Sequence, residues 1–503
     1  MLEFIQIYII PFYLHLQNKI MTKRITLLTI VMFLMTGVFA QGYKITIKIK
    51  GAKPNSTYRL ANNYADKNQL QDSAKADKNG VIVFENKLKK LPNGIYLVVT
   101  PSSNYFEMVV SQTDQNFTME TDTLFDTEKF VIKNSLENSA FFEFNIFAGQ
   151  KSLEYEGIKT RLMVARNKKD SVALQKQFQA LDSQIQAKRQ EIANRNPAMF
   201  ISKVFRSFRE LEEPVPVRNP DGSLQDSNYR YNYYKDHYWD NIDLSEDGLL
   251  RTPVYHNKLK TFMTRTFAQI PDSIIKEADK LIKKIERGGA NELFRYTVMW
   301  ITNHYEDSKI VCMDKVLHYM GTNYYCAGKT PWADTSTVRK ICDHVVKIRP
   351  TLCEAQAPPI INLFDSTYNK QIDLYSINSP FTVVIFWDHQ CGHCQKTMPR
   401  LNTLYDSLNK IGIKFEVYSV YTQDDWEGWK KYLREKRLKY INVGNMYGKS
   451  NYRKDYFFIS TPQIYILDKD KRIKLKNIDI DEIARILELL TIESREEAKK
   501  KKN

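Results

Sequence analysis

Two cysteines, Cys391 and Cys394, stand at C-x-x-C spacing shortly after a continuous apolar run at residues 382–387. That run is rich in β-branched and aromatic residues, which predicts a strand buried on both faces of a sheet. The residues after the first cysteine can form a helix, and residues three apart on its first turn share a face, so the two sulfurs can reach disulfide distance. Unpaired N–H groups and the positive end of that helix favour a thiolate. The pattern therefore predicts thiol–disulfide exchange.

The chemistry assigns a role to each residue of the C-G-H-C motif. We expect Cys391 to be the nucleophile that attacks a substrate disulfide, and Cys394 to resolve the mixed disulfide. His393 lies between them and can be cationic, which favours the thiolate as the helix dipole does. Cys391 and Cys394 are therefore the predicted catalytic residues, and His393 is expected to modulate them.

The motif has companions elsewhere in the chain that together resemble the thioredoxin fold. They are Trp387 before the dithiol, Pro399 in the following helix, and Thr461-Pro462 at the start of a later strand. The resemblance implies that Thr461-Pro462 is a cis-proline pair: Pro462 faces the dithiol, and the backbone of Thr461 binds the substrate peptide. Trp387 is expected to modulate the site from the end of its strand.

Further features resemble one branch of that family. A predicted hairpin before the first core strand (residues 360–365 and 371–374) and a helix at residues 425–438 are similar to the exported TlpA/ResA-like proteins. The whole chain is similar to multidomain thioredoxin-family proteins of Bacteroidota. The resemblance implies an oxidoreductase without a cofactor that acts on protein thiols and disulfides, with a membrane electron donor as a further partner.

The chain departs from the thioredoxin pattern at two positions. Thioredoxins carry a buried acid two residues before the tryptophan, and here Ile385 occupies that position. Proton transfer from the resolving cysteine then uses another group, for which Asp388 and His389 are candidates, or proceeds unaided. Gln390 replaces the tryptophan that often precedes the first cysteine, which changes the rim of the substrate surface.

Other kinds of site that use a C-x-x-C pair fit this sequence less well. A zinc site needs a second ligand pair, and attachment of c-type haem needs a histidine where the chain has Gln395. Peroxidase chemistry needs a lone cysteine in another setting. The alternative from a different class is a binding or scaffold protein, in which the other domains hold a partner and redox activity is secondary. The direction of electron flow stays open.

The length of 503 residues predicts about three domains, and a content of 43% apolar and 12% aromatic residues indicates a globular protein. The net charge of +16 comes from 74 basic and 58 acidic residues, whose signs are interleaved. Without a basic block flanked by stacking aromatics, nucleic acid is not an expected partner.

The N-terminal region resembles a secretory signal peptide. Met21 and the basic residues after it precede an apolar stretch at 25–35, and small residues end at Ala40. The stretch is too short to span a membrane. We expect residues 1–40 to be removed, with translation starting at Met21, and a soluble periplasmic or otherwise exported protein.

We predict a multidomain architecture. Residues 41–133 show short alternating strands and form an N-terminal all-β sandwich. Residues 134–355 form a central all-α domain. Residues 356–495 alternate strands and helices and form a C-terminal α/β thioredoxin fold, and residues 496–503 are a charged tail.

The central domain contains two ambiguous groups of residues. The aromatic stretch at residues 229–239 either packs helices together or binds a protein. Asp236, His237 and Asp240 are of metal-ligand types, but the sequence offers no second cluster of ligands, so no metal site is predicted. The remaining cysteines form one or two structural disulfides, or stay as buried thiols: they are Cys312, Cys326, Cys342 and Cys353.

Overall fold

The structure, a computed structural model, describes residues 42–500 except 166, 210 and 458–459. The predicted signal peptide therefore lies outside the described residues. Two compact units, Met1–Lys258 and Leu259–Asn503, make up the chain and are described separately. Along the chain a β region is followed by a helical region and then by an α/β region, which confirms the predicted fold class.

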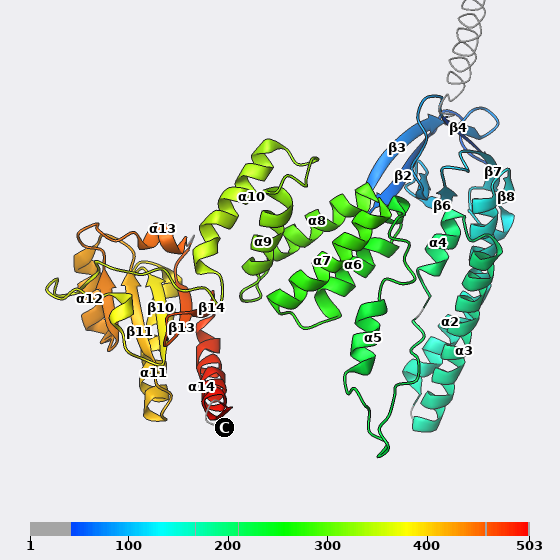
Figure 1. The fold of residues 1–503 in the computed structure, drawn as a ribbon. Helices are drawn as coiled ribbons and strands as arrows, with labels where there is room; N and C mark the ends of the chain where they lie inside the picture. Colours follow the sequence, from blue (N-terminus) through cyan, green and yellow to red (C-terminus); the bar gives the residue numbers. More distant parts are fainter. Residues whose placement is uncertain (1–41, 166, 210, 458–459, 501–503) are drawn as a thin grey trace, which may run out of the picture. The chain divides into compact units, whose positions relative to one another are not determined.

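The first unit begins with two four-stranded sheets that form the predicted sandwich (Figure 1). One sheet has the order β4-β1-β7-β8 and consists of β1 (Tyr43–Lys50), β4 (Val81–Asn86), β7 (Asn116–Asp122) and β8 (Val131–Lys133). The other has the order β3-β2-β5-β6 and consists of β2 (Thr57–Tyr64), β3 (Lys67–Lys75), β5 (Gly94–Val99) and β6 (Tyr105–Val110). Alternation in β1 buries one face of the strand: Tyr43, Ile45, Ile47 and Ile49.

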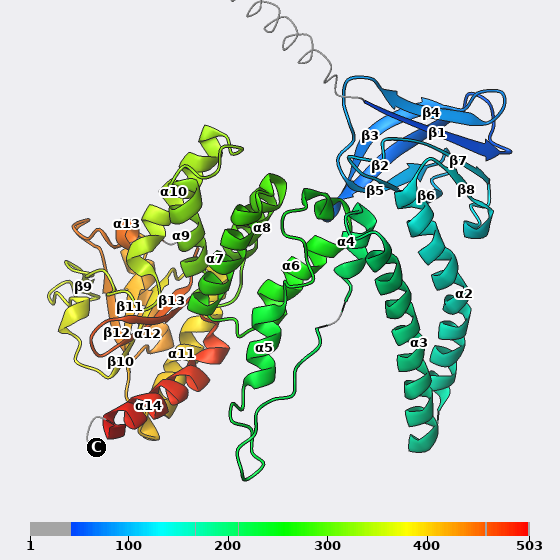
Figure 2. The same ribbon diagram turned by 45° about the vertical axis from the view of Figure 1, so that its right-hand side comes forward.

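Two long helices follow, α2 (Leu136–Val164) and α3 (Lys168–Arg195), which lie side by side in both views (Figures 1 and 2). Glu143 on α2 joins them, because its carboxylate accepts hydrogen bonds from Arg195 at 2.7 and 3.0 Å and pairs with Lys188 at 2.8 Å. Shorter elements follow: α4 (Phe200–Arg206), α5 (Tyr229–His237), η2 (Asp247–Arg251) and α6 (Val254–Arg265).

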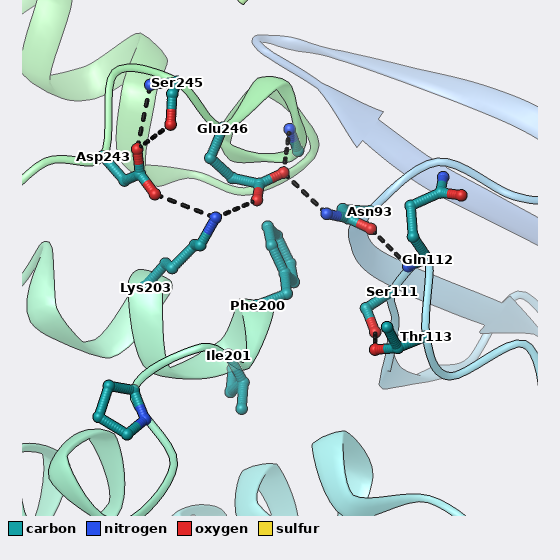
Figure 3. A network of polar contacts seen from close by, with 12 residues as sticks. Asn93, Ser111, Gln112, Thr113, Phe200, Ile201, Lys203, Asp243, Ser245 and Glu246 are labelled. Carbon is teal, nitrogen blue, oxygen red and sulfur yellow. Dashed lines mark hydrogen bonds and ion pairs between the residues drawn. The ribbon is translucent and has the colours of Figure 1, made fainter. Parts of the chain in front are cut away.

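A polar network joins the sandwich to these shorter elements (Figure 3). The Lys203 ammonium lies 3.0 Å from Asp243 and 2.8 Å from Glu246. Glu246 in turn accepts a hydrogen bond from the Asn93 amide at 2.8 Å, and the Asn93 oxygen accepts one from the Gln112 backbone at 2.7 Å. The sandwich and the first helices thus belong to one packed unit.

The second unit begins with helices and contains both disulfides. The helices are α7 (Pro271–Gly288), α8 (Asn291–Glu306), α9 (Asp314–Met320), η3 (Gly321–Tyr325), α10 (Thr335–Ile348) and η4 (Arg349–Thr351). Bonds Cys312–Cys353 and Cys326–Cys342 resolve the pairing that the sequence left open. Residues 307–313, between α8 and α9, form an irregular connection.

A six-stranded sheet with the order β14-β13-β10-β11-β12-β9 organises the C-terminal region. Its strands are β9 (Phe364–Asp365), β10 (Phe381–Trp387), β11 (Glu416–Tyr421), β12 (Ile441–Gly444), β13 (Gln463–Asp468) and β14 (Ile473–Lys476). The helical elements around it are η5 (Leu374–Ser376), α11 (Gly392–Lys410), α12 (Trp426–Lys436), α13 (Tyr452–Tyr456), η6 (Ile480–Glu482) and α14 (Ile483–Lys500).

Strand β10 lies in the middle of the sheet and is buried on both faces, as its apolar run predicts. Val383, Ile385 and Trp387 pack in the cluster that contains Met398 of α11. Val384 and Phe386, which alternate with them along the strand, pack in the cluster on the opposite face. Packing on both faces therefore fixes the position of β10, and with it the point where the chain passes from β10 into α11.

The predicted hairpin before β10 is present in an irregular form: backbone hydrogen bonds from the N–H groups of Asp365, Ile372 and Leu374 to the carbonyls of Lys370, Leu363 and Ile360 pair the two segments. Only Phe364–Asp365 form a strand, which pairs with β12, and a single bridge joins Phe364 to Gln371. Ile360 and Leu363 are fully buried in a core cluster, and Asn362 between them has a φ of 61° that interrupts an extended strand.

Candidate active site

The dithiol lies where β10 passes into α11, as the sequence predicts. Cys391 is the N-cap residue of α11, and its sulfur accepts a hydrogen bond from the Cys394 backbone N–H at 3.4 Å. Cys391 is partly exposed, whereas Cys394 is fully buried, and both are free thiols. One sulfur is thus accessible from outside, and the other can be reached only through it.

A distant part of the chain completes the site. The Thr461-Pro462 peptide bond is cis, and the Cys391 thiol donates a hydrogen bond to the Thr461 carbonyl oxygen at 3.2 Å. This carbonyl precedes β13, which is paired antiparallel with β10. The sheet therefore brings the two predicted substrate-binding residues to the accessible cysteine.

The surroundings separate the acidities of the two thiols. Burial raises the pKa of Cys391, but hydrogen bonds from the Cys394 thiol, the backbone of Cys394 and His393, and the Thr461 side chain outweigh it, so that its pKa lies below the ordinary value. Burial, together with the hydrogen bond to Cys391, raises the pKa of Cys394 to about 12. The arrangement favours a thiolate on the accessible sulfur.

The two residues expected to modulate the dithiol occupy different environments. Trp387 is fully buried, with its ring centroid 5.2 Å from that of Tyr432 and 5.8 Å from that of Tyr421. His393 is exposed and lines a cavity together with Pro462. Trp387 thus supports the site from within the core, while His393 lies at its surface.

The groups named as substitutes for the missing acid are engaged with other partners. Nδ1 of His389 lies 3.0 Å from the Tyr421 hydroxyl, and its Nε2 lies 3.3 Å from the Asp425 carboxylate. The Asp388 carboxylate accepts a hydrogen bond from the Gln390 backbone at 2.9 Å. The acid's position, Ile385, is fully buried in the core.

A tyrosine that the sequence interpretation did not single out lies beside the resolving cysteine. Tyr432 of α12 belongs to the same core cluster as Cys394, and among the described residues its buried hydroxyl has no hydrogen-bond partner. Burial, with the charge of Cys394 as a second cause, raises the pKa of Tyr432 to about 12. The helical spacing could have indicated it, because Tyr432 follows the buried Trp429 by three residues.

The histidine and acids considered as metal ligands in the helical region form a local contact. His237 Nδ1 lies 2.5 Å from the Asp240 carboxylate, and the His237 ring stacks on Tyr233 with centroids 4.2 Å apart. In the part of the chain that the structure describes, no group of three or more His, Cys, Asp or Glu side chains is placed to hold a metal ion. Within the same part, none of the helices has the length and apolar content needed to cross a membrane.

Comparisons with known proteins match three parts of the chain. Residues 380–473 match a thioredoxin-like family, whereas residues 43–141 and 182–350 match two domains of unknown function, DUF4369 and DUF5106. No curated protein matches the chain.

Several solved structures are similar to part of the chain. A domain of a possible thiol-disulfide isomerase from Cytophaga hutchinsonii is 30% identical, with 30% of this chain and 98% of that chain covered and a TM-score of 0.26. The thioredoxin domain of a thiol-disulfide oxidoreductase from Bacteroides vulgatus is 25% identical, with coverages of 27% and 96% and a TM-score of 0.25. A thioredoxin-like protein from Bacteroides caccae is 18% identical, with coverages of 56% and 99% and a TM-score of 0.41. On the family match, residues 380–473 belong to the thioredoxin-like family, as the resemblance predicts.

Proposed function

We propose that the protein is an exported thiol–disulfide oxidoreductase that exchanges disulfides with protein substrates through Cys391 and Cys394. The observation that carries the proposal is the difference between the two thiols. Cys391 is accessible, has a lowered pKa and touches the Thr461 carbonyl beside a cis proline, whereas Cys394 is buried and has a raised pKa. Attack through one sulfur and resolution by the other follow from this asymmetry.

The exchange proceeds in two balanced steps. The Cys391 thiolate attacks one sulfur of the substrate disulfide, a mixed disulfide forms, and the other substrate sulfur leaves as a thiolate. Cys394 then loses its proton and attacks the Cys391 sulfur, so that the mixed disulfide breaks and the second substrate thiolate is released. Two electrons pass from the dithiol to the substrate, and the same steps in reverse oxidise a substrate dithiol.

The direction is a matter of the reduction potential. A C-G-H-C pair of the disulfide isomerase type is about 90 mV more oxidising than thioredoxin, equivalent to roughly 4 kcal/mol. A cationic His393 acts in this direction because it stabilises the reduced, thiolate form. Net reduction of substrates instead requires a donor that returns two electrons to the disulfide, for which a membrane protein is proposed. Equilibration of the Cys391/Cys394 couple with glutathione buffers measures the potential and distinguishes the two directions.

Export is proposed on two grounds. The N-terminal sequence has the features of a cleavable signal peptide that ends at Ala40. The disulfides Cys312–Cys353 and Cys326–Cys342 are of the kind that persists in oxidising compartments. Cell fractionation tests this part of the proposal independently of the chemistry.

Two variants test the exchange itself. We expect the double variant Cys391→Ala, Cys394→Ala to lose dithiothreitol-dependent insulin reduction, and an activity equal to that of the parent would rule out the proposed enzyme. The single variant Cys394→Ala should accumulate mixed disulfides through Cys391, because the resolving step is blocked. Mass spectrometry that finds the partner on one of the other four cysteines would contradict the assignment of the nucleophile.

A further inference from the structure

A cavity of about 780 Å³ within the second unit is lined by His393, which stands between the two cysteines, and by the cis proline Pro462. One wall comes from the thioredoxin-like domain and includes His393, Thr397 and Pro462. The other wall comes from the helical region and consists mainly of residues 305–314 between α8 and α9, with His344 of α10. We call this space the dithiol cavity. Its volume falls within the range of about 300–1,000 Å³ that is typical of ligand-binding pockets.

The helical wall is tied firmly to the thioredoxin-like domain. The disulfide Cys312–Cys353 joins the irregular connection before α9 to the segment that leads into the sheet. Asp314 forms an ion pair with Lys476 of β14, whose side chain is only 6% exposed. These links hold residues 305–314 in place opposite the cis proline, so the cavity is a built feature of the unit.

The lining offers apolar and polar contacts with little net charge. Glu306 and His344 lie 3.7 Å apart, Asp314 is paired with Lys476, and Lys309 and Asp479 add one charge of each sign. Ile310 is an exposed apolar side chain on this wall, with 49% of its surface accessible. A small disulfide has no flanking chain to contact such a lining. A polypeptide finds contacts for both its apolar and its polar groups.

The position of the cavity decides which part of a substrate would occupy it. A disulfide under attack must meet the Cys391 sulfur next to Thr461, and the residues that flank the substrate cysteine must then lie on either side of that point. The cavity begins at His393 and Pro462, so one flank of the substrate chain is led into it.

We propose that the dithiol cavity binds the polypeptide on one side of the substrate's disulfide, with residues 305–314 of the helical region as a substrate-binding wall. This inference rests on the proposed function and deepens it. The helical region thereby takes part in substrate selection and favours cystines within accessible polypeptide over small disulfides.

The test compares two substrates in matched variants of the full-length chain. Ile310→Glu places a charge in the cavity wall at a surface position, where the fold tolerates it. The control, Ile411→Glu, makes the same change at the far end of α11, where Ile411 is 69% exposed. That end of the 19-residue helix is about 28 Å from the dithiol along its axis. The substrates are insulin and hydroxyethyl disulfide, with dithiothreitol as the reductant.

We expect Ile310→Glu to lower the ratio of kcat/KM for insulin to kcat/KM for hydroxyethyl disulfide by at least about fivefold. Ile411→Glu should leave the ratio as in the parent. An unchanged ratio in Ile310→Glu, or an equal loss on both substrates, would overturn the inference and leave the exchange activity standing. A parent protein inactive on both substrates would instead overturn the proposed function.

A second variant at another position of the wall protects the test against an effect peculiar to one residue. Lys309 is exposed and lines the cavity next to Ile310. Lys309→Glu reverses a charge without touching the core, and its ratio should fall in the same direction. Ile310→Glu and Lys309→Glu with opposite effects would count against a common substrate-binding wall.

Discussion

The two thiols of the dithiol differ most in their contact with solvent and with backbone N–H groups, and this difference can be measured as pH dependence. Alkylation by iodoacetamide follows the thiolate, so its rate rises with pH up to the pKa and is level above it. Because the pKa of Cys391 is lowered, we expect the midpoint of its alkylation at a lower pH than in the denatured protein. Cys394, whose pKa is raised to about 12, should stay unmodified through this range.

Mass spectrometry of the reduced protein, alkylated over a series of pH values, checks both statements in one experiment. A denatured sample, in which the two thiols titrate alike, is the control. Modification of Cys394 before Cys391, or a midpoint for Cys391 above that of the denatured sample, would contradict the assigned environments. The second ionisation is a property of the two thiols together and not of Cys394 alone, because ionisation of one thiol raises the pKa of the other.

The buried hydroxyl of Tyr432 should lower the free energy of unfolding, and mutation can measure this effect. It is buried without a hydrogen-bond partner among the described residues, whereas the buried Tyr440 donates to the Met398 carbonyl at 3.3 Å. Tyr432→Phe should leave the free energy of unfolding unchanged or raise it by about 1 kcal/mol, because no bond is lost. Tyr440→Phe, the matched control, should lower it by about 1 kcal/mol. Urea unfolding of the two variants measures these changes. A larger loss of unfolding free energy for Tyr432→Phe than for Tyr440→Phe would show that the Tyr432 hydroxyl has a hydrogen-bond partner.

At the scale of elements, one carboxylate connects α2 to the start of α4. Glu137 is 2% exposed and accepts hydrogen bonds from the backbone N–H groups of Phe200 and Ile201, each at 2.8 Å. Glu137→Ala leaves two buried donors unpaired, so we expect a loss of about 2–4 kcal/mol in the free energy of unfolding. Glu154→Ala on the same helix removes only an exposed ion pair and should cost less than about 0.5 kcal/mol. Equal losses in urea unfolding would contradict this role of Glu137.

Elements with strong local patterns were predictable, and those that depend on tertiary contacts were not. The alternation of β1 and the apolar run of β10 both mark strands, because burial of one or both faces leaves a signature in sequence. Strand β3 carries no such signature, because every residue of Lys67–Lys75 is exposed or half-exposed, and it is held by pairing with β2. At the candidate site, Cys391 and Cys394 follow from motif spacing, and Thr461 and Pro462 follow from the family resemblance. The place of Tyr432 does not, since it depends on how α12 packs against the sheet.

At the scale of the molecule, the second unit joins helices to the thioredoxin-like domain, and its two disulfides do this to different degrees. Cys326–Cys342 closes a loop of 16 residues within the helical region, whereas Cys312–Cys353 spans 41 residues and reaches the segment before the sheet. Loop-closure entropy gives the two bonds similar stabilisation, about 3 and about 4 kcal/mol. Their removal should therefore lower the free energy of unfolding to a similar extent.

Removal of the one or the other disulfide should have different effects on the connection between the helical region and the thioredoxin-like domain. The double variant Cys312→Ala, Cys353→Ala removes the covalent link of the irregular connection before α9 and leaves the Asp314–Lys476 pair as a tie to β14. We expect faster tryptic cleavage of that connection at Lys309 than in the parent, because proteolysis follows local opening. The variant Cys326→Ala, Cys342→Ala is the matched control and should leave the cleavage rate at Lys309 close to that of the parent. Equal acceleration in both variants would mean that general destabilisation, and not release of the connection before α9, exposes Lys309. Mass spectrometry of the early fragments identifies the cleaved bond and so separates the two outcomes.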